Sequence, residues 1–269
     1  MELSSYTKVY AIGHRQISEL LDGPVVVQEK VDGSQISFGN IGGKLLIRSR
    51  GKKLDLDYPE KMFQPAVDSI RERFASGRLP EGLIIRGEFL GRRKHNVLEY
   101  ARVPRGNVVV WDVEIFDEPE VFLDRTDVFD VAAEADFSLT PEIYKGRLGS
   151  LDQLRPMLER ESFLGGCKVE GVVVKNYAKF SPLTGKILVG KLVADSFKEK
   201  HRKVWGAKPK SVGDIVQRLT EELKTEARWE KGYQHLKESG QIAQTPQDIP
   251  KLFTEVQRDI LEEEEEYIK

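Results

Sequence analysis

The sequence is poor in the residues that build covalent cross-links and thiol-based metal sites. It has a single cysteine, Cys167, so an internal disulfide and a cysteine-based metal cluster are both excluded. The apolar context that follows Leu164 favours a packed thiol over a nucleophile. No apolar run approaches the ~20 residues that a membrane-spanning helix needs, and the N-terminus lacks a signal-peptide pattern. We therefore expect a soluble, cytoplasmic protein without a membrane partner.

The chain also lacks a strong excess of either charge. Its formal net charge is -2 at pH 7 and its pI is about 6.2, although 32% of the residues are charged. This balance excludes a globally basic nucleic-acid binder but allows a local basic face. Apolar material for a core is present, with 39% hydrophobic residues in a chain of 269. This length suits one domain of about 200 residues and a second, small one.

Residues 1 to about 192 show a mixed pattern of strands and helices. Runs rich in β-branched residues predict strands at 25–27, 35–38, 44–47, 82–85, 107–111 and 171–174. Gly42 and Gly43, between two of these runs, predict a hairpin. Helices are predicted over 60–74 and, shortened or kinked by Pro156, over 151–161. Because strands outnumber helices and short turns join them, we expect an α+β fold with antiparallel sheets.

The character of the sequence changes after about residue 193. Residues 206–213 resemble a linker, and from Asp214 onward apolar residues recur at helical spacing, with an interruption over 240–250. We therefore expect an N-terminal domain of residues 1–205 and a small all-helical domain of residues 206–269. The acidic run of residues 262–266 is interpreted as a solvated helix end rather than a metal site.

The sharpest local feature is Lys30, which ends an apolar strand and is followed by Val31, Asp32 and Gly33. The strand fixes the lysine backbone, and the glycine lets the chain turn tightly beside a ligand. A lysine placed in this way can act as a nucleophile if burial or nearby positive charge lowers its pKa. On its own, the Lys-x-Asp-Gly pattern is weak, and an exposed hairpin lysine is its commoner meaning.

Other charged or aromatic residues stand at the ends of strand-like runs or inside them. They are Arg50, Glu88, Trp111, Glu170, Lys175 and Lys191. A charge inside an apolar strand is costly unless it is paired or functional, so several such strands together favour a nucleotide or phosphate site. Taken singly, Trp111 could be a core residue, Glu88 and Glu170 could be structural ion-pair partners, and Arg50 could be a solvated hairpin residue.

In their order along the chain, these motifs resemble those of the covalent nucleotidyltransferase superfamily of ATP-dependent DNA ligases, RNA ligases and mRNA capping enzymes. Within it, the chain looks closest to the nick-sealing RNA ligases of the phage and editing type. Residues 6–9, 94–96 and 197–199 share this likeness, which covers roughly residues 6–205. The resemblance implies an antiparallel-sheet nucleotidyltransferase domain of the ATP-grasp-like ligase type, followed by the small helical domain.

The resemblance also implies a chemistry and a role for each residue. Lys30 would attack the α-phosphate of ATP, carry AMP as a phosphoramidate and release pyrophosphate, with Mg²⁺ or Mn²⁺ as the metal. The implied contacts are Glu29 and Trp111 with adenine, Arg50 with the ribose or the phosphates, Glu88 with the ribose or the metal, Lys175 and Lys191 with the phosphates, and Glu170 with the metal through water. The lysines would favour a neutral Lys30, because like charges depress one another's pKa.

One position departs from the family pattern. Val189 stands where the family usually has the first of two lysines that end its last motif, and Lys186 is a candidate substitute. The departure leaves open how the triphosphate is oriented before Lys30 attacks.

The implied partners are RNA strand ends, with a nicked duplex or an RNA/DNA hybrid among the candidate substrates, and we expect a monomer. Candidate strand-binding residues are Arg92, Arg93, Lys94, Lys198, Lys200, Arg202 and Lys203. Ordinary solvated charge is the alternative for these residues. DNA ligases and capping enzymes append an OB-fold, whereas residues 206–269 have a helical pattern, which favours the RNA-ligase branch. A minimal DNA ligase, a guanylyltransferase and a catalytically silent nucleic-acid-binding module remain as alternatives.

Overall fold

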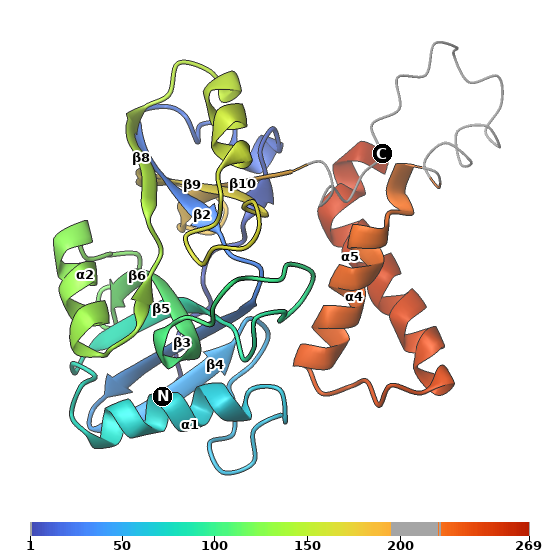
Figure 1. Ribbon diagram of the computed structural model, residues 1–269. Helices are drawn as coiled ribbons and strands as arrows, with labels where there is room; N and C mark the ends of the chain where they lie inside the picture. Colours follow the sequence, from blue (N-terminus) through green and yellow to red (C-terminus); the bar gives the residue numbers. More distant parts are fainter. Residues whose placement is uncertain (1, 195–219, 221, 269) are drawn as a thin grey trace, which may run out of the picture. The chain divides into compact units, whose positions relative to one another are not determined.

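The computed structural model describes residues 2–194, 220 and 222–268 (Figure 1). The chain forms two compact units, Met1–Val193 and Ala194–Lys269, which we call unit 1 and unit 2. The domain boundary that we expected after residue 205 lies outside the described residues. None of the helices in the described ranges combines the length and the apolar character that crossing a lipid bilayer requires.

Unit 1 contains two five-stranded sheets, which confirms the expected α+β fold (Figure 1). Sheet A has the order β1-β10-β9-β2-β8, and its strands are β1 (Tyr10–Ala11), β2 (Pro24–Lys30), β8 (Glu142–Arg147), β9 (Gly171–Phe180) and β10 (Ile187–Val193). Sheet B has the order β4-β3-β5-β6-β7, and its strands are β3 (Ser34–Ile41), β4 (Lys44–Ser49), β5 (Leu83–Phe89), β6 (Val108–Ile115) and β7 (Ser138–Leu139). Among these strands, only the pairs β1–β10 and β6–β7 are parallel.

Two helices, α1 (Gln64–Ala75) and α2 (Arg125–Glu134), pack on one face of sheet B and bury its main core. Alternate strand residues such as Ile36 and Phe38 point into this core and are fully buried, as strand periodicity requires. Helix α1 begins four residues later than predicted, and Pro65 lies in its first turn, where a missing N–H costs nothing.

Sheet A has its own apolar core, covered by the 3₁₀ helices η1 (Arg15–Ile17) and η3 (Leu151–Glu159). A helix was predicted over 151–161, and the observed element is shorter and of the 3₁₀ type. Pro156 lies inside it and cannot donate a backbone hydrogen bond, which disfavours a regular α-helix. A further 3₁₀ turn, η2 (Arg105–Asn107), precedes β6.

The predicted hairpin at Gly42 and Gly43 is confirmed, because these residues join β3 to β4 and Ile41 pairs with Lys44. Both glycines have a positive φ, at 60° and 69°. Positive φ at both central residues is the requirement of a type I′ turn, whose twist matches that of the strands it joins.

The register between β5 and β6 shifts at Trp111, which makes this residue the extra one of a β-bulge. Arg86 pairs with Asp112, whereas the next residue of β5, Gly87, pairs with Val110. An extra residue turns the following side chains to the opposite face of the sheet. Accordingly, Val110 and Val113 both lie in the core under α1 and α2, and Asp112 points away from that core.

Asp112 is the centre of a buried polar cluster that links the two sheets. Its carboxylate accepts hydrogen bonds from Lys175 Nζ of β9 at 2.9 Å, from the Tyr177 hydroxyl at 2.5 Å and from the Tyr6 hydroxyl at 2.6 Å. Asp112 and Lys175 are only 3% and 2% exposed. Burial raises the pKa of Tyr6 and of Tyr177, so both hydroxyls remain donors, whereas burial lowers the pKa of Lys175.

Replacing this carboxylate should therefore destabilise unit 1. We expect Asp112→Ala to lower the free energy of unfolding by about 3–5 kcal/mol, because it leaves the buried Lys175 ammonium without its partner. The double variant Asp112→Ala/Lys175→Met should recover part of the loss, because no buried charge is then unpaired. Urea unfolding of the three chains measures both values, and equal stabilities of the single and double variants would contradict the argument.

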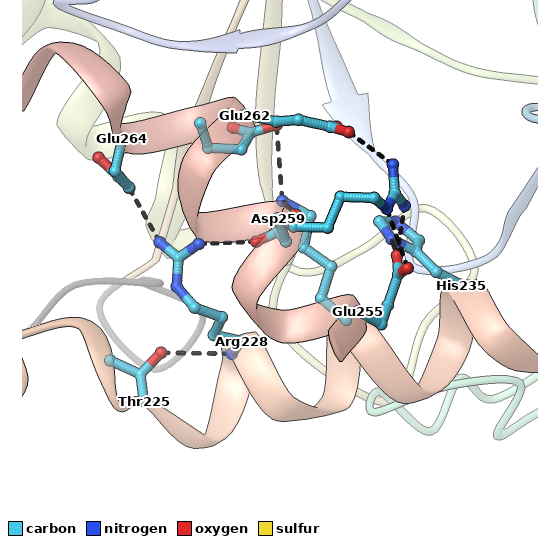
Figure 2. A network of polar contacts seen from close by, with 10 residues as sticks. Thr225, Arg228, His235, Glu255, Asp259, Glu262 and Glu264 are labelled. Carbon is cyan, nitrogen blue, oxygen red and sulfur yellow. Dashed lines mark hydrogen bonds and ion pairs between the residues drawn. The ribbon is translucent and has the colours of Figure 1, made fainter. Parts of the chain in front are cut away.

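The described part of unit 2 is a pair of helices, α4 (Glu226–Glu238) and α5 (Ile249–Ile268), connected through the 3₁₀ turn η5 (Pro246–Asp248). Figure 2 shows Arg228 reaching from α4 to Asp259 and Glu264 of α5, at 2.6 Å and 2.9 Å. Arg228 is fully buried, and Glu264 is only 8% exposed. The acidic run was expected to be solvated, but at Glu264 it is a buried partner of an arginine. A helix pair can bury a carboxylate in this way only when a cation meets it.

A second polar group of unit 2 contains a carboxylate with a depressed pKa. Burial raises the pKa of Glu255, but hydrogen bonds from Arg258 at 3.0 Å and from His235 at 2.9 Å outweigh it (Figure 2). The pKa of Glu255 therefore lies below its ordinary value of 4.5. The charged form of Glu255 is thus favoured by folding.

Because the pKa of Glu255 is lowered by folding, Glu255 stabilises the folded state more at neutral pH than at acidic pH. The stabilisation by Glu255 is fully present above pH 4.5 and is lost as the pH falls through the lower, folded-state pKa. We expect Glu255→Gln to weaken the α4–α5 pair at pH 7 and to make no difference below the folded-state pKa. Urea titrations followed through the amide NMR signals of α4 and α5 at pH 7, 5 and 3 measure this. A difference that stays constant with pH would contradict it.

Candidate active site

Lys30 lies at the end of β2 and contacts a carboxylate from the start of the neighbouring strand. In the pairing of β2 with β9, Lys30 is opposite Gly171, so Glu170 lies directly beside it. The distance from Lys30 Nζ to Glu170 Oε2 is 2.7 Å, and the two side chains are 27% and 10% exposed. The side chain of Lys30 is thus partly exposed while its backbone is fixed by the sheet.

The electrostatic surroundings of Lys30 are mainly acidic. Burial lowers the pKa of Lys30, but the carboxylates of Glu170 and Glu88 outweigh burial, so this pKa lies above its ordinary value. Burial raises the pKa of Glu170, against the opposing charges of Lys30 and Lys191. We expected neighbouring lysines to favour a neutral Lys30. The carboxylates beside it act in the opposite direction and favour the ammonium form.

The structure brings four of the predicted residues together: Lys30, Glu170, Glu88 and Lys191. Lys191 of β10 pairs with Val173, and Lys30 pairs with Gly171. Because Val173 and Gly171 are two residues apart in β9, they face the same side of sheet A, and so do Lys191 and Lys30. Glu88 comes from β5 of sheet B and is half-buried. Charges from both sheets therefore surround the tip of Lys30.

Glu29 is turned away from this group, because neighbouring strand residues face opposite sides of a sheet. Its carboxylate accepts hydrogen bonds from the Ser162 hydroxyl at 2.5 Å and from the Phe163 amide at 3.0 Å, and it is only 5% exposed. Burial raises the pKa of Glu29, while these two hydrogen bonds oppose the rise. The side chain of Glu29 is thus engaged by the loop that precedes β9.

Lys175 and Val189 lie side by side further along sheet A, in register with one another. The ammonium of Lys175 contacts Asp112, and Val189 is fully buried. Lys186, the candidate substitute for the missing lysine, donates to the backbone oxygen of Ser5. It precedes Ile187, which lies six residues, or about 20 Å, along β10 from Val193, the partner of Gly171. Lys186 therefore does not join Lys30.

Trp111 is half-buried, and its ring centroid lies 6.1 Å from that of Tyr6, edge to face. Its backbone oxygen accepts a hydrogen bond from Gln28 Nε2 at 3.2 Å, which is a second link between the sheets. The indole Nε1 is buried and has no hydrogen-bond partner within the described ranges. Arg50 is exposed just beyond the end of β4.

The predicted strand-binding residues fall into two groups. Arg92, Arg93 and Lys94 are exposed in the loop after β5, where Arg93 also lies 3.6 Å from Glu99. The remaining four lie outside the described residues: Lys198, Lys200, Arg202 and Lys203.

The structure also shows contacts that sequence reasoning missed, above all at Asp32. Its carboxylate accepts hydrogen bonds from the backbone amides of Val97 and Leu98, at 2.8 Å and 2.7 Å. Its own amide donates to the Tyr100 hydroxyl at 2.8 Å. The family-like motif at residues 94–96 was the only sequence signal near these partners, and nothing in the spacing connected it to Asp32.

Two carboxylates at the site could hold a metal. In the parts of the chain that the structure describes, no group of three or more His, Cys, Asp or Glu side chains forms a metal cage. Mg²⁺ commonly uses only one or two carboxylates, with water and substrate phosphates completing its shell. Glu170 and Glu88, whose charges both act on Lys30, fit this donor set.

Comparisons with known proteins agree with the fold. A family model described as RNA ligase matches residues 23–193, more than half of the chain. The RNA ligase of Naegleria gruberi with PPi has a TM-score of 0.55 and 17% identity, over 72% of this chain and 57% of that chain. A variant of that ligase with ATP and Mn has a TM-score of 0.54 and 18% identity, over 74% of this chain and 58% of that chain.

A further variant, with AMP and Mn, has a TM-score of 0.52 and 19% identity, over 74% of this chain and 58% of that chain. The chain therefore spans less than three fifths of the length of these solved structures, and at such identities the likeness establishes a shared fold. No curated protein matches the chain in sequence.

Gly33 packs so closely against β5 that a side chain has no room there. A Cβ at this position would lie 2.6 Å from Glu88 Cγ and 2.6 Å from the Phe89 backbone oxygen. We expect Gly33→Ala to lower the free energy of unfolding by about 1–3 kcal/mol, because the turn after Lys30 must shift away from β5. Gly51→Ala is the matched control, since a Cβ at Gly51 meets nothing within 4 Å. Equal urea midpoints for the two variants would contradict the prediction.

Proposed function

The chain belongs to the RNA ligase family, and from that premise we propose that it is an ATP-dependent RNA ligase. It joins a 3′-hydroxyl to a 5′-phosphate by way of AMP, carried first on Lys30 and then on the 5′ end. The observation that carries the proposal is the position of Lys30, which ends a core strand inside the matched residues and lies 2.7 Å from Glu170. The ATP, AMP, PPi and Mn of the Naegleria structures are the substrate, transferred group, leaving group and metal type of such a reaction.

The first step is attack by Lys30 on the α-phosphorus of ATP. Nζ must lose a proton before it attacks, because an ammonium has no free electron pair. Glu170 Oε2 lies within hydrogen-bond distance to accept that proton. The Nζ–phosphorus bond forms, the bond from the α-phosphorus to the bridging oxygen breaks, and pyrophosphate leaves with that electron pair. AMP then passes to the 5′-phosphate, and the 3′-hydroxyl displaces it.

Residues around Lys30 supply charge and orientation for this step. Lys191 contacts the phosphates, and Arg50 contacts the ribose or the phosphates. Lys175 contacts them only after its ammonium leaves the buried pair with Asp112. Glu170 and Glu88 would hold Mg²⁺ or Mn²⁺, which would supply positive charge against the phosphates. Trp111 stacks on adenine, and Glu29 reaches the base through its main chain while its carboxylate stays on Ser162 and Phe163.

RNA strands bind through exposed basic residues. Arg92, Arg93 and Lys94 are exposed in the loop that contacts the turn after Lys30, so their contact with phosphodiesters would place a strand near the nucleophile. Binding of this kind weakens as salt rises, because it releases counterions from the strand. Lys198, Lys200, Arg202 and Lys203, which lie outside the described residues, are proposed to bind RNA phosphates as well.

Labelling with nucleotide tests the proposal. We expect the denatured chain to carry label after incubation with Mg²⁺ and α-³²P-ATP but not with α-³²P-GTP. Lys30→Ala should abolish the label, whereas Lys44→Ala, in the distant β3–β4 hairpin, should retain it. The loaded enzyme should then join a 5′-phosphate RNA to a 3′-hydroxyl RNA. Label from GTP alone would favour a guanylyltransferase, and absence of label from either nucleotide would contradict the enzyme as proposed.

A further inference from the structure

The main chain on both sides of Lys30 is held by two loops. We propose that residues 91–102 and 160–168 form a positioning frame for Lys30, with Asn96 and Ser162 as positioning residues for its attack on ATP. The inference rests on the proposed function and adds residues that take no part in contacting the nucleotide. Both loops contact residues that flank Lys30, one loop on each side of it in the sequence.

On the C-terminal side of Lys30, the first loop forms hydrogen bonds with Asp32, Gly33 and Ser34. Besides the three contacts of Asp32, Asn96 Nδ2 donates to the Gly33 backbone oxygen at 2.7 Å. Ser34 Oγ lies 3.0 Å from His95 Nε2, and the Gly91 amide donates to His95 Nδ1 at 3.1 Å. Because Nδ1 accepts, the neutral imidazole carries its proton on Nε2 and donates it to Ser34.

On the N-terminal side, the second loop holds Glu29 through the Ser162 hydroxyl and the Phe163 amide. Ser162 Oγ also accepts from the Leu164 amide at 3.1 Å, which fixes the hydroxyl while it donates to Glu29. Glu29 and Lys30 are adjacent residues on opposite faces of β2. Tethering the side chain of Glu29 therefore resists rotation of the strand end that carries Lys30.

The two loops are also joined to each other, so they act as one element. The Ala101 amide donates to the Gly165 backbone oxygen at 2.8 Å, and Arg102 donates to the Phe163 backbone oxygen at 2.6 Å. A Cβ at Gly166 would lie 2.8 Å from the Ala101 nitrogen, and Gly166 has a φ of 85°. Only glycine suits a position with both constraints.

The frame matters because the reaction is sensitive to the position of Nζ. In-line attack requires the reacting atoms to lie about 3–3.5 Å apart, and a misplacement of about 1 Å can cost about 100-fold in rate. Further back in β2, Val25 and Val27 are fixed by pairing with β8 and by the apolar core. Lys30 is the last residue of the strand and pairs with β9 alone, because the pairing of β2 with β8 ends at Gln28. The frame therefore adds a constraint where the sheet holds Lys30 from one side only.

The three steps of ligation separate this role from a general structural one. Forming the lysyl-AMP requires Nζ to attack, whereas joining an RNA that already carries AMP on its 5′ end does not. We expect Asn96→Ala and Ser162→Ala each to slow lysyl-AMP formation by about 10- to 100-fold. Joining of a pre-adenylylated RNA should stay within about twofold of the parent chain. Ser162→Thr, which keeps the hydroxyl, should restore lysyl-AMP formation.

Asn40→Ala is the matched control for Asn96→Ala. Both asparagines are half-buried, and each donates through Nδ2 to a backbone oxygen, Asn40 to that of Leu79 and Asn96 to that of Gly33. In both, Oδ1 is buried and has no hydrogen-bond partner among the described residues. We expect this control to leave both steps unchanged.

The frame would be overturned if the frame variants lost the same rate in both steps or lost none. It would also be overturned if Asn40→Ala slowed lysyl-AMP formation as much as they do. A parent chain that forms no lysyl-AMP would overturn the proposed function and the frame together, which distinguishes the two failures.

Discussion

The carboxylate of Asp112 is buried between two sheets and has three hydrogen-bond donors from two other segments of the chain. A charge at this depth is tolerated only because Lys175 and the tyrosine hydroxyls replace the water that it loses. The contact spans sheets A and B, and each sheet carries part of the candidate site. Lys30 and Lys191 belong to sheet A and Glu88 to sheet B, so the relative position of these charges depends on this buried cluster.

The bulge at Trp111 is the local feature that makes the cluster possible. Regular alternation would place Asp112 on the same face as Val110, inside an apolar core where no partner is available. One extra residue returns the carboxylate to the face that meets β9. The pair of Lys30 and Glu170 is similar, since both charges are partly buried and each offsets the cost of burying the other. In the proposed reaction, however, the lysine of this pair gives up its charge before it attacks.

The sequence predicted much of the fold because apolar periodicity and turn chemistry are local. The strands around 25–27 and 171–174 and the hairpin at Gly42 are set by residues that lie next to one another in the chain. Lys30 stood out for the same reason, as a lysine between an apolar strand and an Asp-Gly turn. The partners of Asp32 could not be predicted, because they come from a loop more than 60 residues away that has no periodic pattern.

The sequence by itself determined the α+β class, the family resemblance and the identity of the candidate nucleophile, since each is written in local patterns of residues. Only the tertiary structure decided which charges meet. It turned Glu29 away from Lys30, paired Lys175 with Asp112 and left Lys186 at the far end of β9. The physical reason is that strand register and bulges, which set the face a side chain points to, depend on pairing between distant segments. A change of one residue in that pairing moves a side chain to the opposite face of a sheet.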